Sequence, residues 1–125
     1  APCVYYGTEA ALAGGPDAEQ SGGPEPACRE AFPWGEPWPA DLRSTIAGLA
    51  DLRRNHPNLI RGDLQWQPTG RDGLLGRTSS GLSIWVNRST SQSLEIQPGT
   101  STIWTSGTCD GRFLAPQSAV VDLQG

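Results

Sequence analysis

The feature that most constrains this chain is a short apolar segment near its beginning, Cys3-Val4-Tyr5-Tyr6, which has the pattern of a buried strand. A Gly-Thr-Glu turn, a long segment rich in Gly and Pro, and a helical pattern follow it, with no second strand for it to pair with in parallel. A lone strand and helix leave hydrogen-bonding edges and an apolar helix face uncovered. We therefore expect the chain to begin in the middle of a larger domain, with the partner strands upstream.

The Gly- and Pro-rich segment is the least patterned part of the sequence. The chain has 16 glycines and 11 prolines among 125 residues, and they are concentrated in residues 14–39. A segment of this length without secondary structure is usually functional or disordered. Its aromatic end, Phe32-Pro33-Trp34 and Trp38, indicates that part of it is anchored.

A helix is predicted after this segment. Apolar residues recur at helical spacing, at Leu42, Ile46, Leu49 and Leu52. Asp41 is placed either as the N-cap or in the first turn after Pro39. Pro57 prevents the helix from continuing beyond about Asn55.

From about residue 60 onward the sequence predicts antiparallel β structure. After "LIRGDLQW", the segments "GLLGRTS" and "LSIWVNRS" predict a hairpin through "SSG". The segments "SLEIQPG" and "TSTIWTSG" predict a second hairpin through Gln97-Pro98-Gly99, and "FLAPQSAVVDLQ" closes the chain. We expect Leu82, Ile84 and Val86 to share one face. Short strands with regular turns are typical of a small antiparallel β-sandwich, so the fold class is α+β.

Composition excludes several function classes. The formal net charge is -4 and no run of basic residues appears, so we expect no nucleic-acid partner. No apolar stretch approaches the roughly 20 residues that span a bilayer, so we expect no membrane partner. Cys3, Cys28 and Cys109 form no C-x-x-C pair, which favours free thiols, with a Cys3–Cys28 bridge as the alternative. No metal-ligand cluster, phosphate loop or nucleotide fingerprint is present, and we expect neither metal nor cofactor; the localisation stays open.

Three motifs occur in register along the chain. "VYYGTEAALAGG", "CREAFPW" and "LADLRRNHPNLIRGDL" together resemble the last part of the α-amylase family of α-glucan-active glycoside hydrolases, including neopullulanase-like and α-glucosidase-like members. The resemblance implies that residues 1–56 are the eighth strand, a long loop and the eighth helix of a catalytic (β/α)8 barrel. It implies that residues 57–125 are the antiparallel β domain called domain C. Ala31 departs from the family pattern, which has Pro at this position, directly after "CRE".

The resemblance also locates the chemistry. Retaining glycoside hydrolysis needs two carboxyl groups roughly 5–5.5 Å apart. In the family these groups, and a third carboxylate, follow earlier strands of the barrel, so we expect no catalytic residue in this chain. Active sites of such barrels are built from the loops at the carboxyl ends of the strands. Residues 7–40 are therefore expected to supply part of the rim of the active site.

Three rim residues are candidates for binding substrate, and each has a structural alternative. Arg29 can contact sugar hydroxyls or pair with a loop acid such as Glu25 or Glu30. Glu9 can bind a hydroxyl or hold the backbone of its own loop. Trp34 can stack on a sugar ring or anchor the loop.

Two tryptophans in the β zone are further candidates. Trp85 should lie on the sheet face opposite Ile84 and Val86, and Trp104 on the face opposite Ile103. If both indoles are exposed on one sheet, they form a sugar-stacking platform. The alternative is that this face of the sheet packs against the barrel.

The leading hypothesis is the C-terminal portion of an α-glucan-active hydrolase or transglycosylase. Its partners would be the upstream barrel and, through the parent enzyme, an α-glucan oligosaccharide or polysaccharide. One alternative is a non-catalytic carbohydrate-binding module that uses Trp85, Trp104 or Trp66; another is a purely structural β domain. Sugar binding by residues 57–125 alone distinguishes the binding module from the other two.

Overall fold

The computed structural model describes residues 8–11, 34–35, 37–57 and 63–124 of the chain. The chain divides into two compact units, residues 1–47 and 48–125, which are described separately. The strand predicted at residues 3–6 and most of the Gly- and Pro-rich segment lie outside the described residues, as do Cys3 and Cys28.

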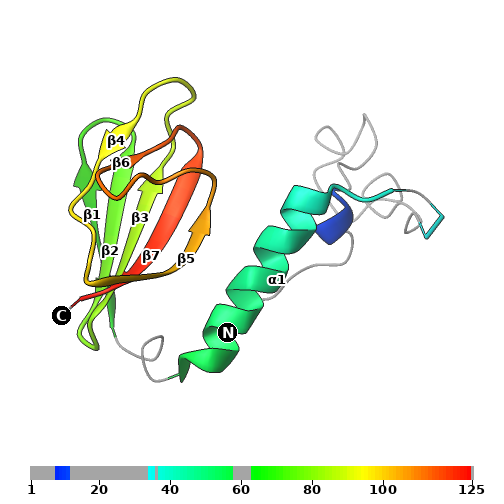
Figure 1. Cartoon of the computed structure of the whole chain (residues 1–125), viewed down its shortest axis with the longest axis horizontal. Helices are drawn as coiled ribbons and strands as arrows, with labels where there is room; N and C mark the ends of the chain where they lie inside the picture. The colour runs from blue at the N-terminus through cyan, green and yellow to red at the C-terminus, as the bar shows by residue number, and fades with distance from the viewer. Residues whose placement is uncertain (1–7, 12–33, 36, 58–62, 125) are drawn as a thin grey trace, which may run out of the picture. The chain divides into compact units, whose positions relative to one another are not determined.

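The described elements are two helices and a set of antiparallel strands (Figure 1). A single turn of 3-10 helix, η1, spans Thr8–Ala10, where a turn was predicted. The helices and strands that follow are α1 (Ala40–Asn55), β1 (Leu64–Thr69), β2 (Gly73–Thr78), β3 (Leu82–Asn87), β4 (Leu94–Glu95), β5 (Ser101–Ser106), β6 (Phe113–Leu114) and β7 (Ser118–Leu123).

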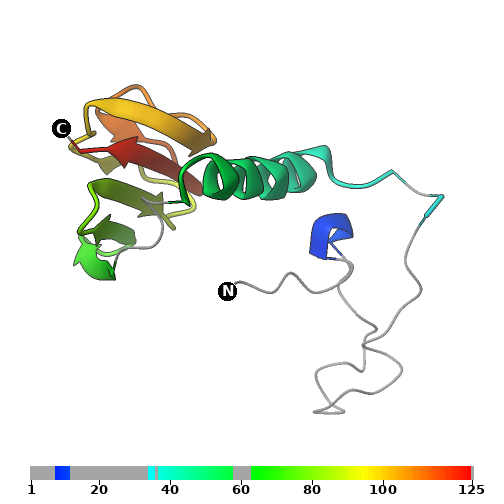
Figure 2. The ribbon, with the colours of Figure 1, turned by 90° about the horizontal axis from the view of Figure 1, so that it is seen from below.

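Helix α1 has the predicted extent and runs without a kink in both views (Figures 1 and 2). It begins one residue earlier than the proposed N-cap, because the Arg43 N–H donates to the Pro39 carbonyl at 3.1 Å. Asp41 therefore lies in the first turn, where a negative charge is favourable to the helix dipole. The helix ends at Asn55, two residues before Pro57.

The larger sheet has five strands in the order β1-β2-β3-β7-β5, and every neighbouring pair is antiparallel. The predicted hairpin of β2 and β3 is confirmed, with Leu75 opposite Trp85 and Arg77 opposite Ser83. Its turn ends at Gly81, whose φ of 90° is in the region that favours glycine. The α+β class with an antiparallel sheet is thus established.

The second predicted hairpin is wrong. Strand β4 pairs with β6 in a separate two-stranded sheet, whereas β5 pairs with β7 at the edge of the larger sheet. Ile96 donates its N–H to Arg112 at 2.8 Å and Thr100 donates to Leu123 at 2.7 Å. The intervening Gly99 lies so close to the Leu123 carbonyl that a Cβ would overlap it. Residues 97–99 are thus a crossover between the sheets, because their neighbours are already paired elsewhere.

The core is formed by side chains from both sheets. Leu75, Trp85 and Val120 come from the larger sheet, and Leu114 comes from the smaller one, with Ile96 directly after β4. Each is 6% exposed or less. The packing of Leu114 and Ile96 against the larger sheet attaches the short strands β4 and β6, which share only two residue pairs with each other.

The register assigns each side chain to a face, because residues directly opposite one another in a sheet point the same way. The row on the core face contains Gln67, Leu75, Trp85 and Val120. The row on the other face contains Trp66, Gly76, Ile84, Val121 and Trp104. Leu82, Ile84 and Val86 share a face, as predicted. The core cluster that contains Leu75, Trp85 and Val120 lies on the opposite face.

We expect Leu114→Ala to destabilise the β domain by about 2–5 kcal/mol, because it removes a fully buried side chain that joins the two sheets. Leu64→Ala, at a position that is 41% exposed, is the control, with an expected change within about 0.5 kcal/mol. Urea unfolding of both variants measures the difference. Equal effects would show that the smaller sheet is not packed on this core.

Candidate functional site

The β domain contains an open groove of about 380 Å³ on the core side of the larger sheet. Its floor is apolar and consists of Leu75, Trp85 and Ile96. Its rim is polar and consists of Gln67, Thr69, Arg77, Glu95 and Gln97. The groove exists because β4 and β6 are each two residues long and leave part of the core face beside β1 and β2 uncovered.

Two polar atoms of this groove are buried without a hydrogen-bond partner among the described residues: Thr69 Oγ1 and Trp85 Nε1. A buried polar group without a partner costs about 1–3 kcal/mol. Trp85 is 6% exposed, so its N–H is desolvated together with its ring. Thr69 and Trp85 both line the groove, but these two atoms have almost no exposed surface in it.

The position of Thr69 depends on a glycine. Thr69 ends β1 opposite Gly73, the first residue of β2. A Cβ on Gly73 would overlap both the carbonyl and the hydroxyl of Thr69, and it would come within 2.8 Å of Leu94. Only a residue without a side chain allows this close approach, so Gly73 fixes the position of Thr69 at the end of β1.

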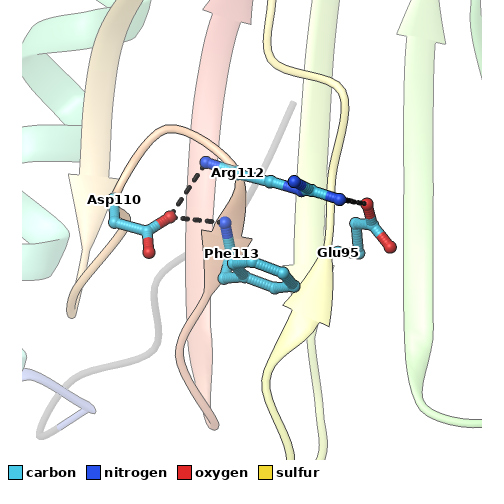
Figure 3. Close-up of polar contacts among 4 residues, drawn as sticks. All are labelled: Glu95, Asp110, Arg112 and Phe113. Carbon is cyan, nitrogen blue, oxygen red and sulfur yellow. Dashed lines mark hydrogen bonds and ion pairs between the residues drawn. The ribbon is translucent and has the colours of Figure 1, made fainter.

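The opposite rim is positioned by a turn at Asp110 (Figure 3). The Asp110 carboxylate accepts the backbone N–H of Phe113 at 2.6 Å and that of Arg112 at 2.9 Å. Gly111, with a φ of 90°, completes the turn. Arg112 then extends to Glu95, donating to its Oε1 from Nε at 3.1 Å and from the terminal nitrogen at 2.9 Å.

These contacts have electrostatic consequences. The N–H groups of Phe113 and then of Arg112 lower the pKa of Asp110 below its usual value, because they stabilise the charged carboxylate. The Arg112–Glu95 pair is mostly exposed and is worth about 0–1 kcal/mol. The pair orients Glu95 toward Arg112 at the rim. With Arg77 and Glu95 as the charged residues, the lining of the groove is formally neutral.

Of the three candidate rim residues, only Trp34 has a side chain among those that the structure describes. Arg29 lies outside the described residues, and Glu9 is described only by its backbone in η1. Trp34 is 82% exposed. Its ring centroid is 6.4 Å from that of Trp38, a tilted aromatic pair. The Arg43 guanidinium lies 5.5 Å from the centroid of Trp38.

The structure also places Trp85 and Trp104 on opposite faces of the larger sheet. Trp85 is opposite Val120, whereas Trp104 is opposite Val121, one residue further along β7. A register shift between Thr102 and Trp104 causes this difference, and strict alternation along the sequence does not anticipate it. Trp85 is buried in the core, so its ring is not an exposed stacking surface. Trp104 is partly buried and shares its face with Trp66, which is 50% exposed.

Sequence reasoning did not find the polar rim of the groove. Gln67, Thr69, Glu95 and Gln97 belong to no motif, and they come together only through the crossover of the chain between the two sheets. The Asp-Gly pair at residues 110–111 was the one local signal of the turn that positions Glu95.

The part of the chain that the structure describes contains no group of three or more His, Cys, Asp or Glu residues placed to hold a metal. None of the described helices is long and apolar enough to cross a membrane. Comparison of the sequence with protein-family models gave no match, and a search of curated proteins gave none either. The resemblance to the α-amylase family therefore rests on the three sequence motifs.

We expect the Asp110 carboxyl to titrate below 3.8, its ordinary value, in a carbon-detected NMR titration. Because its pKa is lowered by folding, the stability that it contributes is present above the unfolded pKa and is lost as the pH falls through the folded pKa. Asp110→Asn keeps an acceptor but removes the charge. This variant should be less stable than the parent at pH 7, and the difference should vanish at a pH below the folded pKa. Titration of Asp110 at or above 3.8 would contradict this account.

Proposed function

We propose that this chain is the C-terminal portion of an α-glucan-active glycoside hydrolase or transglycosylase of the α-amylase type. Residues 1–56 would be the end of its (β/α)8 barrel and residues 57–125 its domain C, a small β-sandwich. The order of the three motifs supports this assignment, as does the position of the antiparallel β domain directly after a helix that ends in "LRRNHP".

The single observation from the fold that best supports the proposal concerns α1. Apolar residues recur at helical spacing along it, yet none of its residues is buried within the described part of the chain. Leu49 is 43% exposed. An amphipathic helix is stabilised mainly by packing of its apolar side. The wall of a barrel, formed by the preceding strands, is the kind of surface that such a helix covers.

In this proposal the chain supports catalysis without carrying it out. The loop of residues 7–40 forms part of the rim, and Arg29 offers several fixed donors to sugar hydroxyls or to a catalytic carboxylate. Glu9 follows the last barrel strand and accepts a hydrogen bond from the substrate or from its own loop. The exposed indole of Trp34 is accessible for stacking on a sugar ring. The two carboxyl groups of the reaction come from the missing strands.

The first test is the reading frame upstream of Ala1 in the encoding DNA. A complete barrel takes roughly 250 residues, so we expect a frame of about that length with an Asp and a Glu that close successive strands. A start codon directly before Ala1 would refute the enzyme assignment. It would leave a non-catalytic saccharide-binding domain or a structural β domain.

The second test addresses Arg29 in the complete enzyme. Arg29→Ala should lower kcat/KM on longer oligosaccharides by about tenfold, which corresponds to losing one charge-assisted hydrogen bond of about 1.5 kcal/mol. Arg53→Ala, at an exposed position in the last turn of α1, is the matched control and should leave kcat/KM unchanged. An unchanged kcat/KM in the Arg29 variant would assign this residue a structural role.

A further inference from the structure

We propose that the face of the larger sheet opposite the core cluster, which we call the outer face, is the docking surface for the second half of helix α1. The contact that fixes the helix is between Gly48 of α1 and the indole of Trp104 in β5. Both residues belong to the compact unit of residues 48–125. The second half of the helix and the sheet then unfold together. This proposal does not require the α-amylase assignment.

The first step is the composition of the outer face. An antiparallel sheet that has one face in water carries polar side chains on that face. In the neighbouring strands β3 and β7, the core face already contains the apolar residues Trp85 and Val120. The residues of these two strands on the outer face are also all apolar: Leu82, Ile84, Val86, Ala119, Val121 and Leu123. Both faces of this sheet therefore have the composition of a covered surface.

The second step is the uneven covering of the outer face. Val121, in the middle of this face, is 2% exposed. At the β1 edge the face carries its own Trp66, whose ring lies over Gly76 and remains 50% exposed. At the β5 edge Trp104 is partly buried, and the residue that lies against its indole is Gly48, which comes from outside the sheet. The β5 edge is therefore the part of the face where a helix is already in contact.

The third step is the closeness of that contact. A Cβ on Gly48 would lie 2.6 Å from Trp104 Nε1 and 3.2 Å from Trp104 Cδ1, so a side chain at this position would overlap the indole. A glycine inside a helix weakens folding about fivefold in equilibrium constant relative to alanine. The contact with Trp104 gives a physical reason for a glycine in the middle of a 16-residue helix.

The fourth step is the geometry of α1. With 3.6 residues per turn, Leu52 lies about 40° around the helix from Gly48 and thus on the same side. Leu42, Ile46 and Leu49 lie about 100–160° away from Gly48. The side of α1 that contacts Trp104 thus differs from its main apolar stripe. Docking on the outer face leaves that stripe for the surface of a preceding domain.

The first test asks whether the second half of α1 and the β domain unfold as one unit. The full chain, labelled with ¹⁵N, is unfolded in urea and followed by the backbone amide signals of Leu52 in α1 and Val120 in β7. We expect the two signals to give the same midpoint, because coincident transitions are typical of one cooperative unit. Loss of the folded Leu52 signal at a lower urea concentration than that of Val120 would overturn the proposal.

The second test addresses the contact itself. Trp104→Val removes the indole, and in this background Gly48→Ala should strengthen folding about fivefold in equilibrium constant, through helix propensity alone. In the parent the new Cβ overlaps the indole, so the gain should be lost or reversed. The effects of Gly48→Ala in the two backgrounds should differ by at least about fivefold, the low end of the cost of overpacking. Urea unfolding of the parent, both single variants and the double variant gives these values.

Trp66→Val is the matched control, because it is the same substitution on the same face at the opposite edge of the sheet. Gly48→Ala should have the same effect in this background as in the parent. An effect that does not depend on Trp104, or that depends equally on Trp66, would show that the proposed contact does not hold the helix.

The test stays decisive if Gly48→Ala alone fails to fold. Recovery of a folded chain when Trp104→Val is added supports the contact, and failure to recover overturns it. None of these results bears on the reading frame upstream of Ala1, so the two proposals fail independently.

Discussion

The packing of Leu114 and Ile96 against Leu75, Trp85 and Val120 is the interaction on which the β domain depends. Strands β4 and β6 pair through only two residue pairs, which is too little to hold a hairpin together in water. They remain in place because their apolar side chains complete a core that the larger sheet cannot close alone. The crossover at Gly99 and the turn at Asp110 both follow from the need to bring these two short strands over the same face.

The same packing explains why the candidate groove lies where it does. A two-stranded cover cannot span a five-stranded sheet, so the core face stays open beside β1 and β2. Polar side chains border the uncovered part of the core. In β1, for example, Gln67 points to the core face, whereas Trp66 points to the other face. The groove is thus a product of unequal sheet widths, and its lining combines core and surface residues.

Much of the fold follows from local sequence. The extent of α1 is set by Pro39 and Pro57, and the β2–β3 hairpin by two alternating segments around Gly81, so both could be predicted from short windows. The pairing of β4 with β6 could not, because the residues that decide it are separated by the whole of β5.

The candidate sites divide in a similar way. Arg29, Glu9 and Trp34 were predicted as substrate-binding residues from short sequence motifs. The face of Trp104 depends on a register shift in β5, which reverses the side-chain direction after one irregular residue. The partnerless atoms of Thr69 and Trp85 depend on which groups the tertiary structure leaves beside them, and no sequence pattern contains that information.

The register shift between Thr102 and Trp104 also bears on how separate copies of the chain meet. Strand β5 forms one edge of the larger sheet, and an uninterrupted edge is a template for strand exchange and fibril growth. The irregularity changes the spacing of the outward N–H and C=O groups partway along this edge. A second strand that paired with one half of β5 would be out of step with the other half, so the irregularity interrupts this edge as a template for pairing.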